Sequence, residues 1–203
     1  MKTRTLRIAG IAGAALITSI ALSGCTINLG APNNNSGSGI MDGNGMMGNN
    51  SNSSGFSGSD IMFAQMMIPH HQQAVDMGTL AETRALSPEV KALAAKIKAE
   101  QAPEIIQMQG WLSDSNSSMG MGHDMGHDMG GMLSEADMKA LENATGAAFD
   151  KLYLEGMIAH HEGAIQMAQM VIDSSNDEAR ALGEAIVSSQ TEQIAYMKTL
   201  LAK

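Results

Sequence analysis

One stretch of this sequence occurs twice, and the repeat constrains the fold more than any other feature. Residues 63–77 read FAQMMIPHHQQAVDM and residues 153–167 read YLEGMIAHHEGAIQM, with matching residues at a fixed offset of 90. A second repeated pattern follows each copy: Gln-x2-(Glu/Gln)-Ile-x2-Met begins at Gln101 and again at Gln190. The chain has therefore used one unit, a pair of helices, twice.

Both copies have the spacing of amphipathic helices. Apolar residues and histidines recur every three or four positions from Phe63 to Ala81, which predicts one broad apolar face. Pro69 lies inside this helix and predicts a kink, whereas the second copy has Ala159. From periodicity and capping residues we expect helices at 60–86, 88–112, 134–143, 147–172 and 176–201, with Ser87, Ser134 and Ser175 as N-caps.

Short connections at 84–88 and 173–177 make each pair of long helices antiparallel. The sequence thus predicts an all-α, antiparallel four-helix bundle of two repeated hairpins, in up-down order. Equal rise along paired helices sets Gln101 level with His71, and Glu104 with Ile68. In the second hairpin the same geometry sets Gln190 level with Ala159, and Gln193 with Gly156. Polar residues of each second helix therefore converge on the level of the histidines.

Residues 1–25 are predicted to be a lipoprotein signal peptide. Three basic residues precede an apolar run at 8–21, and the sequence Leu-Ser-Gly-Cys ends at Cys25, the only cysteine. This ending resembles a lipobox, whose cysteine carries the lipid; an ordinary secretory signal is the alternative. We expect an exported protein that is anchored to the membrane only through Cys25 and faces the periplasm or the cell exterior. A single cysteine leaves no disulfide framework.

Residues 26–59 are rich in Gly, Asn and Ser and predict a flexible tether, so the bundle domain is expected at 60–203. Loss of the signal peptide would remove three of the 12 Lys and Arg residues and none of the 21 Asp and Glu residues. The remaining chain is acidic, which excludes nucleic acid as a partner because its binding needs a basic face.

Imidazole and thioether groups share a face of each repeated helix. Met67 precedes His70 by three residues and His71 by four, and the second copy repeats this spacing. Thioethers suit Cu(I) and Ag(I), whereas zinc prefers thiolate, imidazole and carboxylate. Core packing is the alternative role of each methionine, but four buried imidazoles without a partner would be unfavourable. The candidate copper ligands in the bundle are His70, His71, His160, His161, Met66, Met67, Met77, Met108, Met157, Met167 and Met197.

A glycine-rich loop at 113–133 holds a second set of candidate ligands. Its residues 119–132 read MGMGHDMGHDMGGM, and this glycine content excludes a stable helix. A flexible loop has no core to fill, so its methionines favour metal binding; a low-complexity spacer is the alternative. The candidate ligands here are Met121, His123, Met125, His127 and Met129.

These motifs resemble domain-of-unknown-function family 305, which includes the CopM-like exported copper-binding proteins. The resemblance covers about residues 60–201 and rests on Asp-x2-Phe-x2-Met-Met-Ile-Pro-His-His from Asp60, and on Met-Ile-x-His-His-x-Gly-Ala from Met157. It implies a ferritin-like helical bundle that is exported and, in some members, binds copper and contributes to metal resistance. Gly156 replaces the methionine that matches Met66, so a separate second site is expected to be weaker. Gln193 likewise replaces the acid that matches Glu104.

We therefore predict a copper-binding protein, not an enzyme, that sequesters Cu(I) or hands it to a transfer partner and contributes to metal tolerance or homeostasis. Cu(II) and Ag(I) are the other candidate metals. A ferritin-like metallo-oxidase is a weaker reading, because di-iron bundles need Glu-x-x-His on two helices and no glutamate stands three residues before a bundle histidine. A helical interaction module of the cell envelope is the other alternative. The sequence leaves open the oligomeric state and whether the histidines form one site or two.

Overall fold

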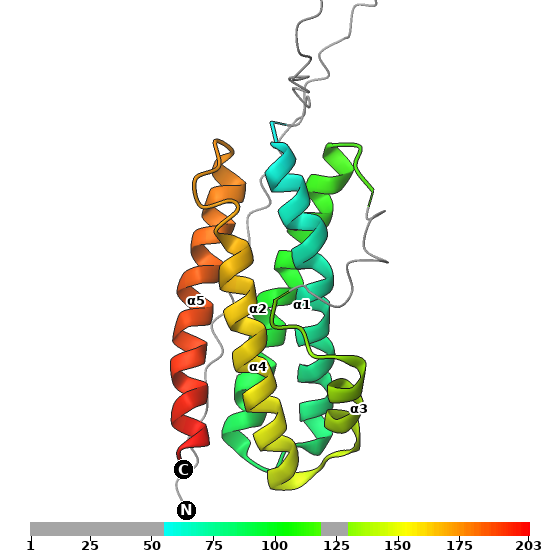
Figure 1. Ribbon diagram of the computed structural model, residues 1–203, viewed down its shortest axis with the longest axis vertical. Coiled ribbons are helices and arrows are strands. Elements are labelled where there is room, and N and C mark those ends of the chain that lie inside the picture. The colour runs from blue at the N-terminus through cyan, green and yellow to red at the C-terminus, as the bar shows by residue number, and fades with distance from the viewer. Residues whose placement is uncertain (1–54, 119–129) are drawn as a thin grey trace, which may run out of the picture. The chain divides into compact units, whose positions relative to one another are not determined.

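The computed structural model describes residues 55–118 and 130–203. This part of the chain is built from five helices, α1 (Gly58–Arg84), α2 (Pro88–Asp114), α3 (Glu135–Asn143), α4 (Gly146–Ala168) and α5 (Asp177–Leu201) (Figure 1). The predictions for the signal peptide, for Cys25, for most of the tether and for the loop ligands at 121–129 fall outside the described residues. No helix in the described part combines the length and the apolar character needed to cross a bilayer.

Capping residues set most of the helix starts that the sequence predicts. The Ser57 hydroxyl accepts the backbone N–H of Asp60, and the Asp60 carboxylate accepts the backbone N–H of Ser57 at 2.7 Å, which completes a capping box on α1. Ser87 caps α2, with Pro88 at the first helical position, and Ser134 caps α3.

The connection between α4 and α5 differs from the expected one. Helix α4 ends at Ala168 rather than at 172, because the next residues form tighter i to i−3 hydrogen bonds, such as that from Val171 to Ala168. Asn176, not Ser175, caps α5, since its side-chain oxygen accepts two backbone N–H groups of the first turn. The connection is therefore longer than predicted and brings Val171 into the core.

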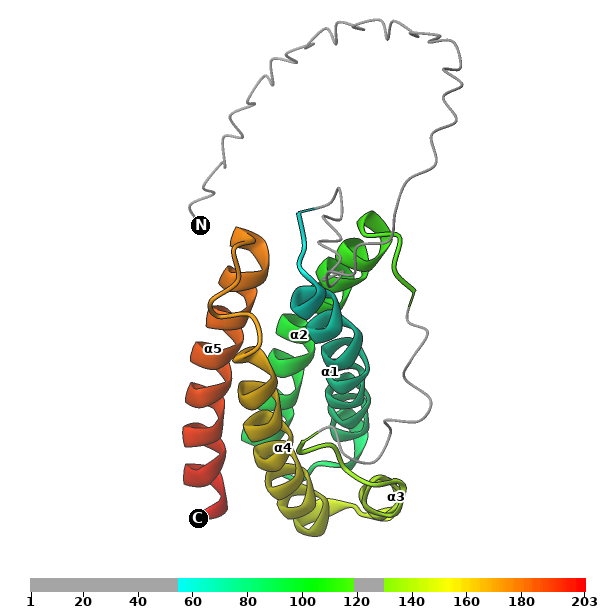
Figure 2. The same cartoon turned by 45° about the horizontal axis from the view of Figure 1, so that its top comes forward.

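Two helical hairpins, α1/α2 and α4/α5, pack chiefly through α1 and α4 (Figures 1 and 2). Helices α2 and α5 contact each other only slightly. At one end, Ala85 after α1 forms a backbone bridge with Gly146 at the start of α4, so α1 and α4 are antiparallel. At the other end, the Trp111 indole of α2 donates to the Glu178 carboxylate of α5 at 3.2 Å.

The antiparallel bundle is confirmed, but its helices are not joined in simple up-down order. The end of α2 lies beside the start of α1, where the Trp111 and Phe56 rings are 5.0 Å apart. Helix α4 starts at the opposite end, so α2 and α4 run in the same direction. A single long connection of this kind is found in ferritin-like bundles.

A level of polar side chains divides the apolar core into two clusters. On α1, His70 and His71 lie between Ile68 of the first cluster and Ala74 of the second. On α2, α4 and α5 the buried polar residues likewise lie between residues of the two clusters, in reversed order on α2 and α4. We call this set the histidine level; its buried polar residues are His70, His71, Gln101, His160, His161, Gln190 and Gln193.

Candidate metal centre

The four bundle histidines come together at the histidine level, two from α1 and two from α4. All four are fully buried, at 0% exposure. The rings of His70 and His160, which are equivalent in the repeat, face each other with centroids 3.6 Å apart. His71 and His161 lie outside this central pair, with centroids 6.5 and 6.2 Å from their neighbours in the sequence. The structure therefore gathers the four side chains into one centre that both hairpins share.

Backbone carbonyls fix the orientation of the central pair. The His160 Nε2 atom lies 2.9 Å from the His70 carbonyl oxygen, and the His70 Nε2 atom lies 3.3 Å from the Gly130 carbonyl oxygen. A carbonyl oxygen can only accept a hydrogen bond. Each of these two rings therefore carries its proton on Nε2, which leaves a lone pair on Nδ1.

Side-chain acceptors fix the outer pair in the same way. The His71 Nε2 atom lies 2.7 Å from the Glu104 carboxylate, and the His161 Nε2 atom lies 2.6 Å from Oε1 of Gln193. The Gln193 amide also donates from its Nε2 to the Glu100 carboxylate, so its oxygen is the atom that faces His161. Both outer rings are thus protonated on Nε2 as well.

Nothing pairs with the other nitrogen of any of these rings. The Nδ1 atoms of all four histidines are buried without a hydrogen-bond partner. Such atoms are rare in folded proteins, because an unpaired buried polar group is unfavourable by about 1–3 kcal/mol. Metal-bound histidines have this same arrangement, in which one nitrogen donates to an acceptor and the other is free for the metal.

Burial also keeps His70, His160 and His161 uncharged, because it lowers their pKa values. It lowers the pKa of His70 to about 3, with the nearby His71 as the next cause. Burial lowers the pKa of His161 to about 4 and that of His160 well below its ordinary value of 6.5. Neutral imidazole is the form that binds metals, so these three side chains are ready to bind without first losing a proton.

Two glutamines add further unpaired atoms to the histidine level. Gln101 on α2 and its repeat equivalent Gln190 on α5 are 3% and 2% exposed. Neither amide atom of Gln101 has a partner, and the Oε1 atom of Gln190 has none. The sequence predicted that both would face the histidines, and their buried unpaired oxygens are further donors for a bound cation.

Six candidate methionines are buried, and they flank the histidine level in two sets of three. Met67, Met108 and Met167 lie in the first apolar cluster, and Met77, Met157 and Met197 lie in the second. Met66 is half-buried against the first cluster. Each set contains two methionines from one hairpin and one from the other, so the thioethers, like the histidines, are shared between the repeats.

Across residues 55–118 and 130–203, no group of three or more His, Cys, Asp and Glu side chains is placed to hold a metal ion. A metal at the histidine level would therefore need amide or thioether donors besides imidazole. Imidazole combined with thioether suits Cu(I) or Ag(I), whereas an amide oxygen is a harder donor.

The end of the predicted Met/His loop packs directly onto this centre. Gly131 has a positive φ of 85°, and a Cβ atom there would lie 2.0 Å from the carbonyl oxygen of Ala159. A Cβ atom on Gly163 would lie 1.5 Å from the carbonyl oxygen of Gly130. Only glycine fits these positions, so the backbone of this segment closes the α1/α4 face beside His70.

This contact was not predicted from the sequence, although the repeat contains a signal for it. Gly163 matches Gln73, and the Gln73 side chain holds the backbone of Leu133 through bonds of 2.8 and 3.0 Å. Gly156, which replaces the equivalent of Met66, lies under the Leu133 side chain. Two of the positions at which the copies differ, Gly156 and Gly163, therefore contact residues 130–133.

The fold and this centre define a class of protein, a four-helix bundle with a buried level of histidine and glutamine between methionine-containing clusters. The model of the family described as "Domain of unknown function (DUF305)" matches residues 60–201, and the chain belongs to this family. The resemblance seen in the sequence is thereby confirmed. No curated protein matches the chain.

Several solved structures are similar to this chain. A DUF305 protein from Streptomyces coelicolor, assigned as secreted, is 34% identical with a TM-score of 0.65, over 71% of this chain and 92% of that one. A DUF305 fragment from Deinococcus radiodurans is 29% identical with a TM-score of 0.66, over 72% and 97%. CopM in its Cu(I)-bound form is 31% identical with a TM-score of 0.60, over 70% and 94%. CopM has also been solved with Cu(II) and with Ag bound.

Proposed function

We propose that this protein binds copper at the histidine level, chiefly as Cu(I), and sequesters it or hands it on outside the cytoplasmic membrane. The observation that carries this proposal is the set of four buried Nδ1 lone pairs without partners. Water or a protein group normally satisfies such atoms, and a metal ion would do so here.

The donor chemistry favours copper or silver over other metals. Neutral imidazole and thioether are ligands that Cu(I) accepts, and no described cysteine is available for a thiolate site. The acceptors Glu104 and Gln193 would orient two of the rings from behind, as second-sphere partners do in known metal sites. The similarity to CopM, a protein solved with Cu(I), Cu(II) and Ag, supports the same group of metals.

Copper binding without catalysis is the activity we propose. The described residues offer ligands and orienting acceptors, but the helices lack the Glu-x-x-His pairs of a di-iron oxidase. An interaction module would leave the unpaired imidazoles without a role. We further propose that Cys25 carries a lipid, that residues 26–59 tether the bundle to the membrane, and that the Met and His residues at 121–129 collect metal for it.

A competition titration of Cu(I) against a chromophoric chelator tests this function. Residues 26–203 would be compared with a variant in which His70, His71, His160 and His161 are Ala. A third protein would have Ser in place of each Met and His between 119 and 129, which leaves the packed Gly130–Leu133 segment in place. Circular dichroism would check that each variant is helical.

Tight binding that survives the loop changes but not the histidine changes is the expected result. Binding that is lost with the loop alone would assign the metal to the loop and leave the bundle as a scaffold. A wild-type protein that binds Cu(I) no better than a methionine-rich peptide would overturn the copper function and favour the interaction module.

A further inference from the structure

The buried histidines need a route by which a metal ion reaches them. All four have 0% exposure, so no ion contacts them from solvent directly. The α1/α4 face is closed by the backbone of Gly130 and Gly131 against α4. Within each hairpin the helices pack closely, whereas α2 and α5 contact each other only slightly. The α2/α5 face is therefore the loosest side of the described bundle.

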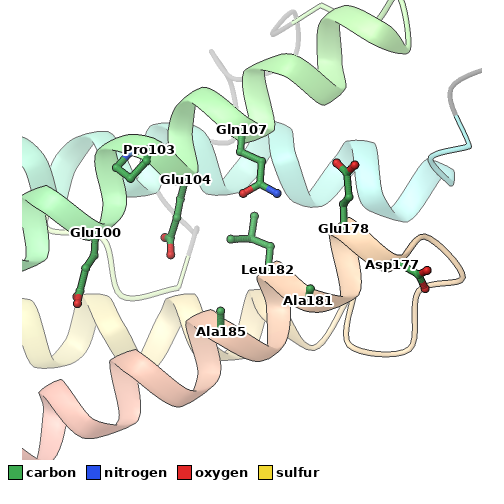
Figure 3. Close-up of a pocket in the computed structure, with 9 residues that line it drawn as sticks. All are labelled: Glu100, Pro103, Glu104, Gln107, Asp177, Glu178, Ala181, Leu182 and Ala185. Carbon is green, nitrogen blue, oxygen red and sulfur yellow. The ribbon is translucent and has the colours of Figure 1, made fainter. Parts of the chain in front are cut away.

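A groove of about 620 Å³ lies between α2 and α5. Glu100, Glu104 and Gln107 of α2 point toward α5 (Figure 3). Glu178 and Leu182 of α5 point toward α2, and Ala185 lines the groove with a short side chain. Four of the residues that line the groove are acidic, namely Glu100, Glu104, Asp177 and Glu178. A cleft of one sign of charge concentrates ions of the opposite sign.

Two of these carboxylates connect the groove with the buried histidines of both hairpins. Glu104, whose side chain is 19% exposed, lies 2.7 Å from the Nε2 atom of fully buried His71. Glu100 accepts from the Gln193 amide, which in turn accepts from the His161 ring. The groove floor is therefore one hydrogen bond from one outer histidine and two from the other.

The charge of Glu104 is available to a cation. Among the described residues, His71 is the only basic side chain within ion-pair distance of it. Glu100 pairs with Lys96, and Asp177 pairs with Arg180, but both cations are more than a third exposed and such surface pairs are weak. Glu178 accepts the Trp111 indole N–H. The groove thus keeps a net negative charge at the point nearest to the histidines.

We propose that the α2/α5 groove is the access route for Cu(I) to the histidine level, with Glu104 as the carboxylate whose charge attracts the ion to its floor. This inference rests on the proposed copper binding and adds the path by which the metal arrives. To reach the Nδ1 lone pairs, the ion passes the His71 ring, so the hydrogen bond between His71 and Glu104 opens and re-forms behind it. No covalent bond is made or broken.

The test is the rate at which the protein takes Cu(I) from a chromophoric chelator, followed by stopped-flow absorbance at increasing concentrations of residues 26–203. Ala185→Trp fills the groove at an exposed lining position. Ala195→Trp adds the same side chain to an exposed position of α5 outside the groove. Glu104→Gln keeps an acceptor for His71 but removes the charge.

Ala185→Trp is expected to slow uptake and release by about tenfold each, with the equilibrium affinity unchanged, because a route alters both rates alike. Ala195→Trp is expected to match the wild type. Glu104→Gln should slow uptake and weaken its dependence on salt. Unchanged rates in Ala185→Trp, or an unchanged salt dependence in Glu104→Gln, would overturn the route while copper binding stands. A wild-type protein without copper binding would overturn both proposals.

Discussion

The two hairpins share the histidine level but complete it differently. In the α1/α2 hairpin, the Glu104 carboxylate, which reaches the surface groove, accepts a hydrogen bond from His71 Nε2. In the α4/α5 hairpin, the Gln193 amide, which is only 6% exposed, accepts a hydrogen bond from His161 Nε2. The comparison shows that the repeat preserves the function of this position, which is to accept from Nε2, while its charge is free to differ.

A second difference comes from a segment that occurs once. Residues 130–133 lie across α4, where they require Gly163 and pack closely on Gly156, whereas α1 has Gln73 and Met66 at the matching positions. The two repeated helices therefore differ at positions that residues 130–133 contact. Gly163 is explained by packing, while the expectation that Gly156 weakens a separate second site stays a prediction.

The largest loss of stability is expected when a side chain is added to α4 at Gly163, where residues 130–133 pack. Gly163→Ala would place a methyl group 1.5 Å from a backbone oxygen, so we expect a loss of about 3 kcal/mol of stability or displacement of residues 130–133. Gly110→Ala is the matched control, because nothing lies within 4 Å of its Cβ position, and we expect a gain of about 0.5–1 kcal/mol. Urea unfolding followed by circular dichroism measures both; similar changes in the two variants would contradict the packing.

The next effect concerns the uncharged state of the shared level. His161 has a lowered pKa of about 4 in the fold, against 6.5 when unfolded. The unfolded chain therefore binds the extra proton as the pH falls, and stability is lost from pH 6.5 downward. We expect His161→Gln to remove about 1.4 kcal/mol per pH unit of this loss between pH 6.5 and 4.5. Parallel unfolding free energies for wild type and variant across this range, measured in chelator, would refute the assignment.

A smaller effect separates the two acceptors. Gln193→Ala removes an acceptor that is only 6% exposed and leaves the buried His161 N–H unpaired, so we expect a loss of about 2 kcal/mol. Glu104→Ala should lose only about 1 kcal/mol, since water in the groove can replace the carboxylate. Urea titrations of both variants provide the test, and the reverse ranking would show that the charge of Glu104 outweighs its exposure.

The smallest effect compares the first helix of each hairpin. Ser57 caps α1 with its side chain, but Thr145 makes no such bond at the start of α4. Ser57→Ala should therefore destabilise the protein by about 1 kcal/mol, and Thr145→Ala by a few tenths. Thermal unfolding of the two variants side by side measures the difference; equal shifts in Tm would argue against the capping box.

Much of the architecture could be predicted from the repeat, because helical periodicity and capping residues are local signals. The histidine level and the convergence of Gln101 and Gln190 on it followed from pairing antiparallel helices. The contact levels were less accurate, since Glu104 was expected opposite Ile68 but bonds to His71. Side chains on a helix lean toward its N-terminus, so contacting pairs lie C-terminal to the residues that are level.

The packing of residues 130–133 could not be predicted in this way. A short glycine-containing segment has no periodicity, and its position depends on which helix face offers room. The absence of side chains at Gly156 and Gly163, which match Met66 and Gln73 in the repeat, was the local indication. The direction of the long connection was likewise unpredictable, because both bundle orders bury the same helix faces.

Each apolar cluster contains methionines from both hairpins, and this sharing has a consequence for assembly. Met67 and Met108 of one hairpin complete their cluster with Met167 of the other, and His70 meets its own equivalent, His160, at 3.6 Å. A lone hairpin would expose half of this interior and could cover it only by joining a second copy about a two-fold axis. This chain thus covers, within one molecule, the apolar faces of two similar hairpins. It cannot dissociate on dilution, and each half can change one residue without changing its twin.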